Sequence, residues 1–441
     1  MKIRSLVIAI IVLGALTGAL YWSNLHKPAD DTVVKASADG APKILSVNEA
    51  DLTKVDLRKQ NGDQLSLARN PSGAWEIVAP GPMSADQSAV SSMLGTFSAL
   101  NADRLVEDKA TDLDQYGLAK PALEVDLVEK NNKNQRLLVG DDTPAGGGAY
   151  AMLTGDPRVF TIATYTKSSI EKNANDLRDK RLITLEPDKI SRIELVSKNQ
   201  NLEFGRNKDE WQILKPKPLR ADSSQVGELL NRLTQARMET NSPEDAKKTT
   251  SAFTSGTAVA TAKVTGESGT QQLDVRKNKT DFYAKSSVVP GVYKITADVG
   301  QALDKKLDDF RNKKLFDFGF DEPNKVEIHD GARAYFLTRS GNDWWAADGK
   351  KLDSSSVQPV LGNIRGLNAT KFRESGFTTP ALDVTVTSND GKRVEKVAIA
   401  KFGDKYIAKR EGDSTLYELE SSAITDLQKS ASELKPADIK K

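Results

Sequence analysis

Three tryptophans, each followed by a segment with helical spacing, constrain this chain most. Trp75, Trp211 and Trp344 lie 136 and 133 residues apart (211 − 75 and 344 − 211). After each comes a segment led by aspartate in which apolar residues recur at i, i+3, i+4, i+7 and i+10, which is one face of an α-helix. These apolar residues are Val90, Met93, Leu94, Phe97 and Leu100; Val226, Leu229, Leu230, Leu233 and Ala236; and Val357, Val360, Leu361, Ile364 and Leu367. The pattern predicts three tandem copies of one module, each longer than the roughly 20–50-residue unit of a solenoid.

Short predicted strands lead up to each tryptophan. In the first copy, Val55–Leu57, Leu65–Leu67 and Trp75–Ile77 alternate apolar and polar residues, which is the period of a half-buried strand. The sequences Asn61-Gly62 and Asn70-Pro71-Ser72-Gly73 supply turns between them. The opening unit is therefore predicted to be an antiparallel meander.

The order of predicted elements sets the fold class and the domain boundaries. A helix follows the first meander, then a second meander and a closing helix, so that helices cover sheet faces. We predict an α+β protein: three tandem copies of an antiparallel meander–helix–meander–helix module, after one N-terminal transmembrane helix. The copies are expected at residues 44–183, 184–316 and 317–441.

Capping residues predict where the long helices begin. Asp86 or Ser84 is the expected N-cap in the first copy, and Asp222 is expected to cap the second helix. In the third copy, Pro359 would remove a hydrogen bond from a helix that began just after Asp353. We therefore expect this helix to begin near Ser356, which places the proline in the first turn, where it is tolerated.

The N-terminal segment predicts a membrane anchor. Residues 1–5 contain Lys2 and Arg4, and residues 6–25 are almost entirely apolar over about 30 Å of helix, one hydrocarbon core. The positive-inside rule places residues 1–5 in the cytoplasm and the rest outside it. Residues 26–43 are polar and are predicted to be a linker. A cleaved signal peptide is the alternative; the anchor predicts a single-pass protein of the cytoplasmic (inner) membrane with its bulk in the periplasm.

Composition excludes several classes of chemistry. The chain has no cysteine, which removes disulfides, thiolate nucleophiles and zinc–thiolate sites. Its two histidines, His26 and His329, are far apart in sequence, so a histidine-rich metal site or a Ser-His-Asp triad would depend on His329 alone. With 63 basic and 61 acidic residues, the chain gives no electrostatic case for binding nucleic acid.

Aromatic and glycine-rich segments are the first candidates for a binding site. Trp344-Trp345 could form a platform for sugars, but the repeated position of Trp344 predicts a core residue. Trp345 is expected on the opposite face of its strand, so if any of these tryptophans is exposed for binding, it is Trp345. The glycine-rich stretch from Asp141 to Gly148 precedes a predicted strand instead of the helix N-terminus that a phosphate site needs, so Gly146–Gly148 is predicted to be a hairpin loop.

Charged groups supply the remaining candidates. The acidic pairs Asp112-Leu113-Asp114 and Asp308-Asp309 lack the spacing of a calcium loop, and His329 reads as a surface residue near the end of a strand. Basic residues are expected near the C-terminal ends of the closing helices, where they favour the helix dipole. They are Arg178, Lys180, Arg181, Arg311, Lys313 and Lys314. We predict no catalytic, cofactor-binding or metal-binding residues and no cofactor.

These motifs together resemble a known family. The strands Trp75-Glu76-Ile77, Trp211-Gln212-Ile213 and Trp344-Trp345-Ala346, the aspartate-led helices and the turn Gly117-Leu118…Pro121-Ala122-Leu123 are similar to a bacterial envelope family, domain of unknown function number 4340. The resemblance covers nearly all of the chain after Ile44. It implies an accessory role beside ABC-type transporters of the gliding-motility auxiliary kind, and no catalytic residues.

The functional prediction follows from the anchor and the tandem modules. We expect a non-catalytic, membrane-anchored periplasmic repeat protein that acts as an interaction or scaffold component of an envelope complex. Its expected partners are the inner membrane and envelope proteins, with an ABC-type transporter complex as a candidate. The alternatives are an envelope glycan hydrolase that uses paired carboxylates and a glycan- or lipid-binding module.

Overall fold

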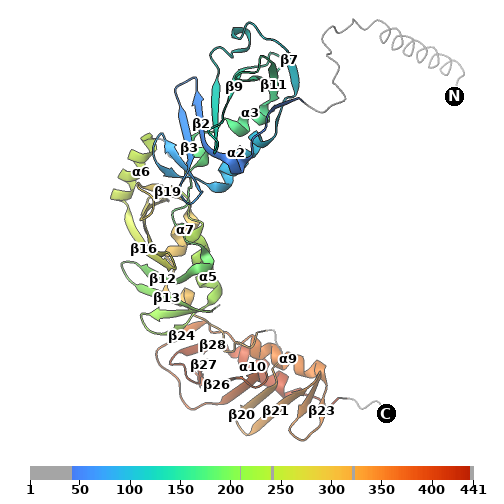
Figure 1. The fold of residues 1–441 in the computed structure, drawn as a ribbon. Coiled ribbons are helices and arrows are strands. Elements are labelled where there is room, and N and C mark those ends of the chain that lie inside the picture. The colour runs from blue at the N-terminus through green and yellow to red at the C-terminus, as the bar shows by residue number, and fades with distance from the viewer. Residues whose placement is uncertain (1–41, 209, 240–242, 320–322, 438–441) are drawn as a thin grey trace, which may run out of the picture. The chain divides into compact units, whose positions relative to one another are not determined.

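A computed structural model describes residues 42–208, 210–239, 243–319 and 323–437 (Figure 1). The fold is α+β with antiparallel sheets, as predicted. Within the described residues no helix is long and apolar enough to cross a membrane. The predicted N-terminus 1–5, the predicted transmembrane helix 6–25 and nearly all of the predicted linker 26–43 lie outside this part of the chain. Two compact units meet in sequence between Asp179 and Lys180.

The first unit is built on a nine-stranded sheet in the order β5-β4-β3-β2-β8-β9-β10-β11-β7, beside a small pair, β1-β6. Its described elements are β1 (Lys43–Leu45), η1 (Glu49–Asp51), β2 (Leu52–Lys59), β3 (Gln64–Arg69), β4 (Trp75–Ala79), β5 (Met83–Ser84), α2 (Gln87–Ser98), β6 (Leu100–Asn101), β7 (Arg104–Glu107), η2 (Asp114–Tyr116), β8 (Leu123–Glu129), β9 (Asn134–Asp142), β10 (Gly148–Leu153), β11 (Val159–Ala163), α3 (Thr164–Ile170) and α4 (Ala174–Leu177).

The second unit begins with an eight-stranded sheet in the order β15-β14-β13-β12-β16-β17-β18-β19. Its described elements are η3 (Pro187–Lys189), β12 (Ile190–Val196), β13 (Asn201–Asn207), β14 (Glu210–Lys215), β15 (Leu219–Arg220), α5 (Ser223–Thr234), α6 (Pro243–Ser255), β16 (Thr257–Gly266), β17 (Gly269–Asn278), β18 (Asp281–Ser286), β19 (Tyr293–Ile295), α7 (Ala297–Leu303) and α8 (Leu307–Phe310).

The same unit ends with a nine-stranded sheet in the order β23-β22-β21-β20-β25-β26-β27-β28-β24. Its described elements are β20 (Lys325–Asp330), β21 (Arg333–Ser340), β22 (Asp343–Ala346), β23 (Lys351–Leu352), α9 (Ser354–Arg365), β24 (Lys371–Arg373), β25 (Leu382–Ser388), β26 (Arg393–Phe402), β27 (Lys405–Arg410), β28 (Leu416–Leu419) and α10 (Ser421–Ser432). The first, second and third sheets thus follow one order of strands: a meander runs outward from a central strand, the chain returns through a helix, and a second meander continues from the other side of that strand.

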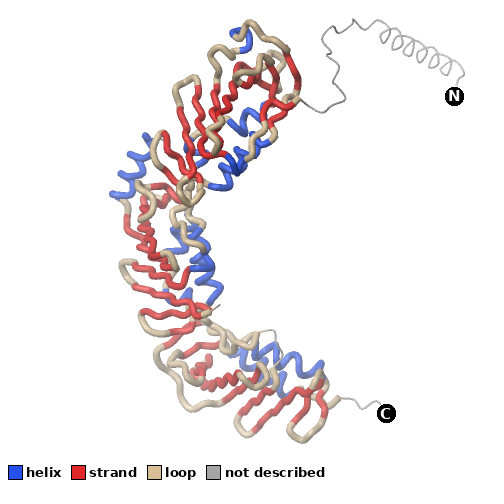
Figure 2. Tube along the Cα trace, in the orientation of Figure 1, coloured by secondary structure: helices blue, strands red, loops and turns tan. Residues whose placement is uncertain are grey.

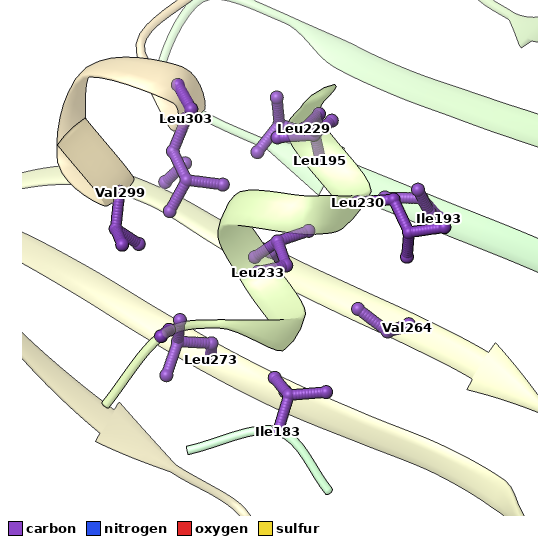
Figure 3. Packing of buried hydrophobic residues seen from close by; sticks show 14 of the residues in the cluster. Ile183, Ile193, Leu195, Leu229, Leu230, Leu233, Val264, Leu273, Val299 and Leu303 are labelled. Atoms are coloured by element: carbon purple, nitrogen blue, oxygen red, sulfur yellow. The ribbon is translucent and has the colours of Figure 1, made fainter. Parts of the chain in front are cut away.

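Helices cover one face of each sheet and enclose its core (Figure 2). In the second sheet, α5 is capped by Asp222, whose carboxylate accepts hydrogen bonds from the amides of Ser224 and Gln225. The apolar face of α5 then packs against the sheet and against α7 (Figure 3). Its members Val226, Leu229, Leu230 and Leu233 are all buried, and each contributes about 2 kcal/mol of burial free energy.

The opposite face of each sheet is only half covered, and we call it the half-open face. In the first sheet, Tyr116 of η2 packs its ring on Tyr150 of β10, with centroids 4.9 Å apart. In the second sheet, α6 lies on the side opposite α5 and α7 (Figure 1), and its last carbonyl groups accept hydrogen bonds from Arg276 of β17. In the third, Arg373 lies over the ring of Phe402. The first meander of each sheet keeps side chains exposed on this face.

Three predicted helix limits are wrong. Helix α9 begins at Ser354, two residues before the predicted start, and contains Pro359 in its interior. It begins there because the carboxylate of Asp353 accepts a hydrogen bond from the Ser355 amide and caps the helix. The proline removes the hydrogen bond to the carbonyl of Ser355, and that residue is exposed, so water can replace the bond. The closing helices α4 and α8 end at Leu177 and Phe310, since the following residues are extended and bond to strand-like segments instead.

Candidate functional site

The strongest candidate site lies where the second and third sheets of the second unit meet. Residues 310–316 form a closing segment there, which begins at the last residue of α8 and leaves the helix at Arg311. Its backbone is hydrogen-bonded to residues 220–222 at the edge of the second sheet, and to residues 367–369 after α9 in the third. The N···O distances are 2.8 and 2.9 Å on the first side and 2.8 and 3.1 Å on the second. The segment is therefore bonded at once to the edge of the second sheet and to the residues that follow α9.

Asp317 immediately follows this segment and collects charged partners from both sheets. Its two carboxylate oxygens accept hydrogen bonds from Nη2 of Arg220, at 2.6 and 2.5 Å. Arg410 of β27 approaches the same carboxylate at 3.3 Å. The Asp317 amide donates to Oε1 of Glu395, 2.9 Å away, and Arg410 binds that same oxygen at 3.2 Å. The carboxylates and guanidinium groups thus compensate one another in a partly buried setting.

Arg220 also reaches a buried tyrosine of the third sheet. Its Nη1 donates to the carbonyl of Lys314 at 2.8 Å and to the hydroxyl of Tyr417 at 3.3 Å. That hydroxyl donates to Asp413, 2.7 Å away. Burial, with the hydrogen bond to Asp413, raises the pKa of Tyr417 to about 12. Burial alone would raise the pKa of Asp413, but hydrogen bonds from the Thr415 amide and from Tyr417 outweigh it, so the pKa is lowered.

Arg311 adds a stacking contact to the same region. Its guanidinium lies 3.6 Å from the ring centre of Phe372 in β24, and Nη2 donates to the hydroxyl of Thr415. A cation over an aromatic face contributes roughly 0.5–2 kcal/mol, depending on how well water is excluded. We use the name Asp317 network for the group that joins the two sheets. Its members are Arg220, Arg311, Asp317, Glu395, Arg410, Asp413 and Tyr417.

A cleft of about 590 Å³ opens beside the Asp317 network. Trp211 and Ser223 of the second sheet and its helix line one part of it, and Lys314, Arg365 and Arg393 line another. Arg393 donates to the backbone carbonyl of Asp317 at 2.9 Å. The site is thus a polar cleft in which Arg393 is held by its hydrogen bond to Asp317, and its volume is large enough for side chains of another protein.

Carboxylates elsewhere on the half-open faces are also held in charged form. Burial alone would raise the pKa of Asp126, but hydrogen bonds from Arg136 and Arg58, at 2.6 and 2.5 Å, lower it. The pKa of Glu203 is lowered by its hydrogen bond from Lys215, 2.6 Å away, against the effect of burial. Such lowered pKa values are typical of carboxylates in ion pairs and unlike those of a general acid.

The predicted aromatic residues lie where the sequence placed them. Trp75, Trp211 and Trp344 are buried in the cores of the three sheets. Trp345 is 36% exposed on the opposite face of β22. The glycines Gly146 and Gly147 form the hairpin loop between β9 and β10, closed by the Thr143 amide on the Gly148 carbonyl at 2.8 Å.

The predicted charged candidates are not brought together with one another. Asp112 accepts the amide of Asp114 in a local turn, and Asp308 pairs with Arg311. His329 is exposed at the end of β20, while His26 lies outside the described residues. The described residues contain no group of three potential metal ligands. Of the basic residues predicted near helix ends, Arg311 enters the Asp317 network and Lys314 supplies a carbonyl to it.

The key members of the Asp317 network were not predicted. The sequence signal that could have found them is a difference between corresponding positions of the sheets. Arg220, which pairs with Gln212 of β14, corresponds to Ser84, which pairs with Glu76 of β4. Asp317, two residues after Leu315, corresponds to Thr184, two residues after Leu182. Arg220 and Asp317 are therefore a charged pair between the second and third sheets, whereas the corresponding residues, Ser84 and Thr184, are uncharged.

Comparison with known families supports the repeated pattern of the sequence. The model of the family described as Domain of unknown function (DUF4340) matches the chain twice, at residues 75–251 and 211–390. This chain belongs to that family. The two matches begin at Trp75 and Trp211, so at least two copies of the pattern are present, offset by 136 residues (211 − 75). No protein of curated function matches the chain.

Proposed function

We propose that this member of the DUF4340 family is a non-catalytic scaffold of the bacterial envelope, built from three copies of one module. Residues 6–25 would anchor it in the cytoplasmic membrane and residues 26–43 would link the anchor to the modules in the periplasm. The modules would then bind envelope proteins, with an ABC-type transporter as the candidate that the family resemblance suggests.

The Asp317 network is the observation that carries this proposal. It joins two sheets through a shared closing segment and a set of ion pairs, and such a rigid surface supports the proposal because less conformational freedom would be lost when a partner binds. The cleft beside it is where we place that partner's docking site.

The lowered pKa values of three carboxylates argue against these groups as the general acid of a glycan hydrolase. A glycosidase needs one carboxylic acid that stays protonated near neutral pH to protonate the leaving group. Asp126, Glu203 and Asp413 are instead shifted toward the ionised form. These acids therefore suit structural ion pairing.

Site-specific photo-cross-linking in living cells tests the docking site. A photoreactive amino acid replaces Lys314 or Arg393 on the rim of the cleft, and the control replaces Asp63, an exposed residue in a hairpin of the first unit. We expect one or a few envelope proteins to be captured from the cleft positions and not from the control. Capture of no protein, or of the same proteins at all three positions, would contradict the proposal.

Cysteine labelling tests the membrane topology separately. Because the chain has no cysteine, Ser255→Cys creates a single reactive site at an exposed position at the end of α6. A membrane-impermeant maleimide should label it once the outer membrane is permeabilised. Protection of the site until the inner membrane is lysed would overturn the proposed orientation.

A further inference from the structure

The half-open face of the third sheet carries three aromatic side chains on three adjacent strands. They are His329 on β20, Phe336 on β21 and Trp345 on β22. In the strand register Phe336 faces Glu327, two residues before His329, and Trp345 faces Thr338, two residues after Phe336. The three residues therefore form a diagonal row, with about 7–8 Å between neighbouring positions. The rings of His329 and Phe336 meet edge to face, with centroids 5.4 Å apart.

The fold does not require aromatic side chains at these positions. The first and second sheets have the same strand order and a corresponding register. Their residues at the positions of His329, Phe336 and Trp345 are Arg58, Ser66 and Glu76 in the first sheet and Val196, Glu203 and Gln212 in the second. Neither of these sets has an aromatic ring, and both sheets are complete. The row is therefore an addition to the third sheet and not a part of its core.

The surroundings of the row are polar and balanced in charge. Thr338, Thr385 and Thr387 place hydroxyl groups on the same face. Lys325 forms an ion pair with Glu327. Lys351, which faces Trp345, binds Asp343 at 2.9 Å. Because each of these cations has an anion beside it, and Asp383 opposite His329 adds a further anion, the face has no excess positive charge with which to attract a polyanion.

We propose that this face binds a chain of uncharged sugar rings. The C–H groups on one side of a sugar ring carry partial positive charge and pack on the negative face of an aromatic ring. The hydroxyl groups at the edge of the sugar can exchange hydrogen bonds with the threonines and with the paired charges beside the row. A row across three strands matches an extended polymer better than a single sugar. This inference does not depend on the proposed protein partner, which we place at the cleft beside Asp317.

Corresponding residues of the other sheets supply variants that should fold. Trp345→Gln introduces the residue of the second sheet, and Phe336→Ser introduces the residue of the first. Glu76→Ala, at the position of Trp345 in the first sheet, is the matched control. The purified full chain is run in native gels containing hydroxyethyl cellulose and is tested for retention on chitin beads; both polymers are uncharged.

We expect the wild-type chain to be retarded or retained by at least one of these polymers, and about equally at ~1 M salt, where charge interactions are screened within about 3 Å. Trp345→Gln and Phe336→Ser should each weaken binding about tenfold, while Glu76→Ala should leave it unchanged. No binding by the wild-type chain, binding that salt abolishes, or equal binding by Trp345→Gln would overturn the proposal. Unchanged circular dichroism of the variants excludes misfolding as the cause of a loss.

Discussion

Removing the carboxylate of Asp317 should loosen the joint between the second and third sheets. Asp317→Ala deletes both hydrogen bonds from Arg220 and the contact with Arg410, so the Arg220 guanidinium loses its anion and that of Arg410 keeps only Glu395. The side chains of Asp317, Arg220 and Arg410 are 27%, 23% and 14% exposed. Breaking a fully buried pair costs about 3–5 kcal/mol and an exposed pair about 0.2–1 kcal/mol. At this intermediate exposure we expect a cost of about 2 kcal/mol.

Amide hydrogen exchange can measure this cost where it arises. The Leu315 amide bonds to the Leu367 carbonyl at 3.1 Å, and the Ala369 amide to the Lys313 carbonyl at 2.8 Å. If these bonds open when the two sheets separate locally, ~2 kcal/mol corresponds to roughly thirtyfold faster exchange at both amides. Amides in the core of α5 should keep their protection, because the second sheet itself remains folded.

Asp308→Ala is the matched control for this experiment. Asp308 also pairs with an arginine of the Asp317 network, Arg311 at 3.1 Å, but its side chain is 61% exposed. Its loss should cost under about 0.5 kcal/mol and change exchange by less than about threefold. Unchanged exchange at Leu315 and Ala369 in Asp317→Ala, or an equal change in Asp308→Ala, would refute the role that we assign to Asp317.

Three further predictions follow from single positions in the second unit. The pKa of Tyr417 is raised from 10.0 to about 12, so the stability that its neutral phenol contributes is complete below pH 10 and is lost as the pH rises toward 12. Tyr417→Phe should therefore reduce, by up to roughly 2–3 kcal/mol, the fall in the free energy of unfolding that urea titrations measure between pH 10 and 12. An unchanged fall in this variant would refute the assignment. Gly300→Ala would place Cβ 2.1 Å from the ring of Phe282 and should destabilise the chain by about 1–3 kcal/mol in the same unfolding assay. Gly227→Ala in α5 meets no atom within 4 Å and should instead stabilise the chain by about 0.5–1 kcal/mol; a loss of stability there would contradict the described packing.

The sequence predicted the local parts of the fold well because their signals are local. A helix that packs on a sheet must repeat its apolar residues every three or four positions, and the predicted faces of α2, α5 and α9 are all buried. The start of α9 was harder to predict, because the Asp353 cap and Pro359 favour different first residues and their relative strength depends on solvent access to the Ser355 carbonyl.

The Asp317 network could not be predicted in the same way. Arg220 and Asp317 are 97 positions apart, and Arg220 and Tyr417 are 197 apart, so no periodic pattern connects them. Their contact depends on how the closing segment is held between two sheets, which is a long-range property of the fold. Trp345, by contrast, could be placed on the half-open face because neighbouring residues of a strand point to opposite sides.

The closing segment at residues 310–316 has a mechanical consequence. A flexible linker would lengthen under tension before either neighbouring sheet felt the load. Here the link is itself hydrogen-bonded to residues 220–222 and 367–369, so a pull along the chain would load those backbone bonds and the Asp317–Arg220 pair directly. The second unit should therefore transmit force with little extension until this joint breaks.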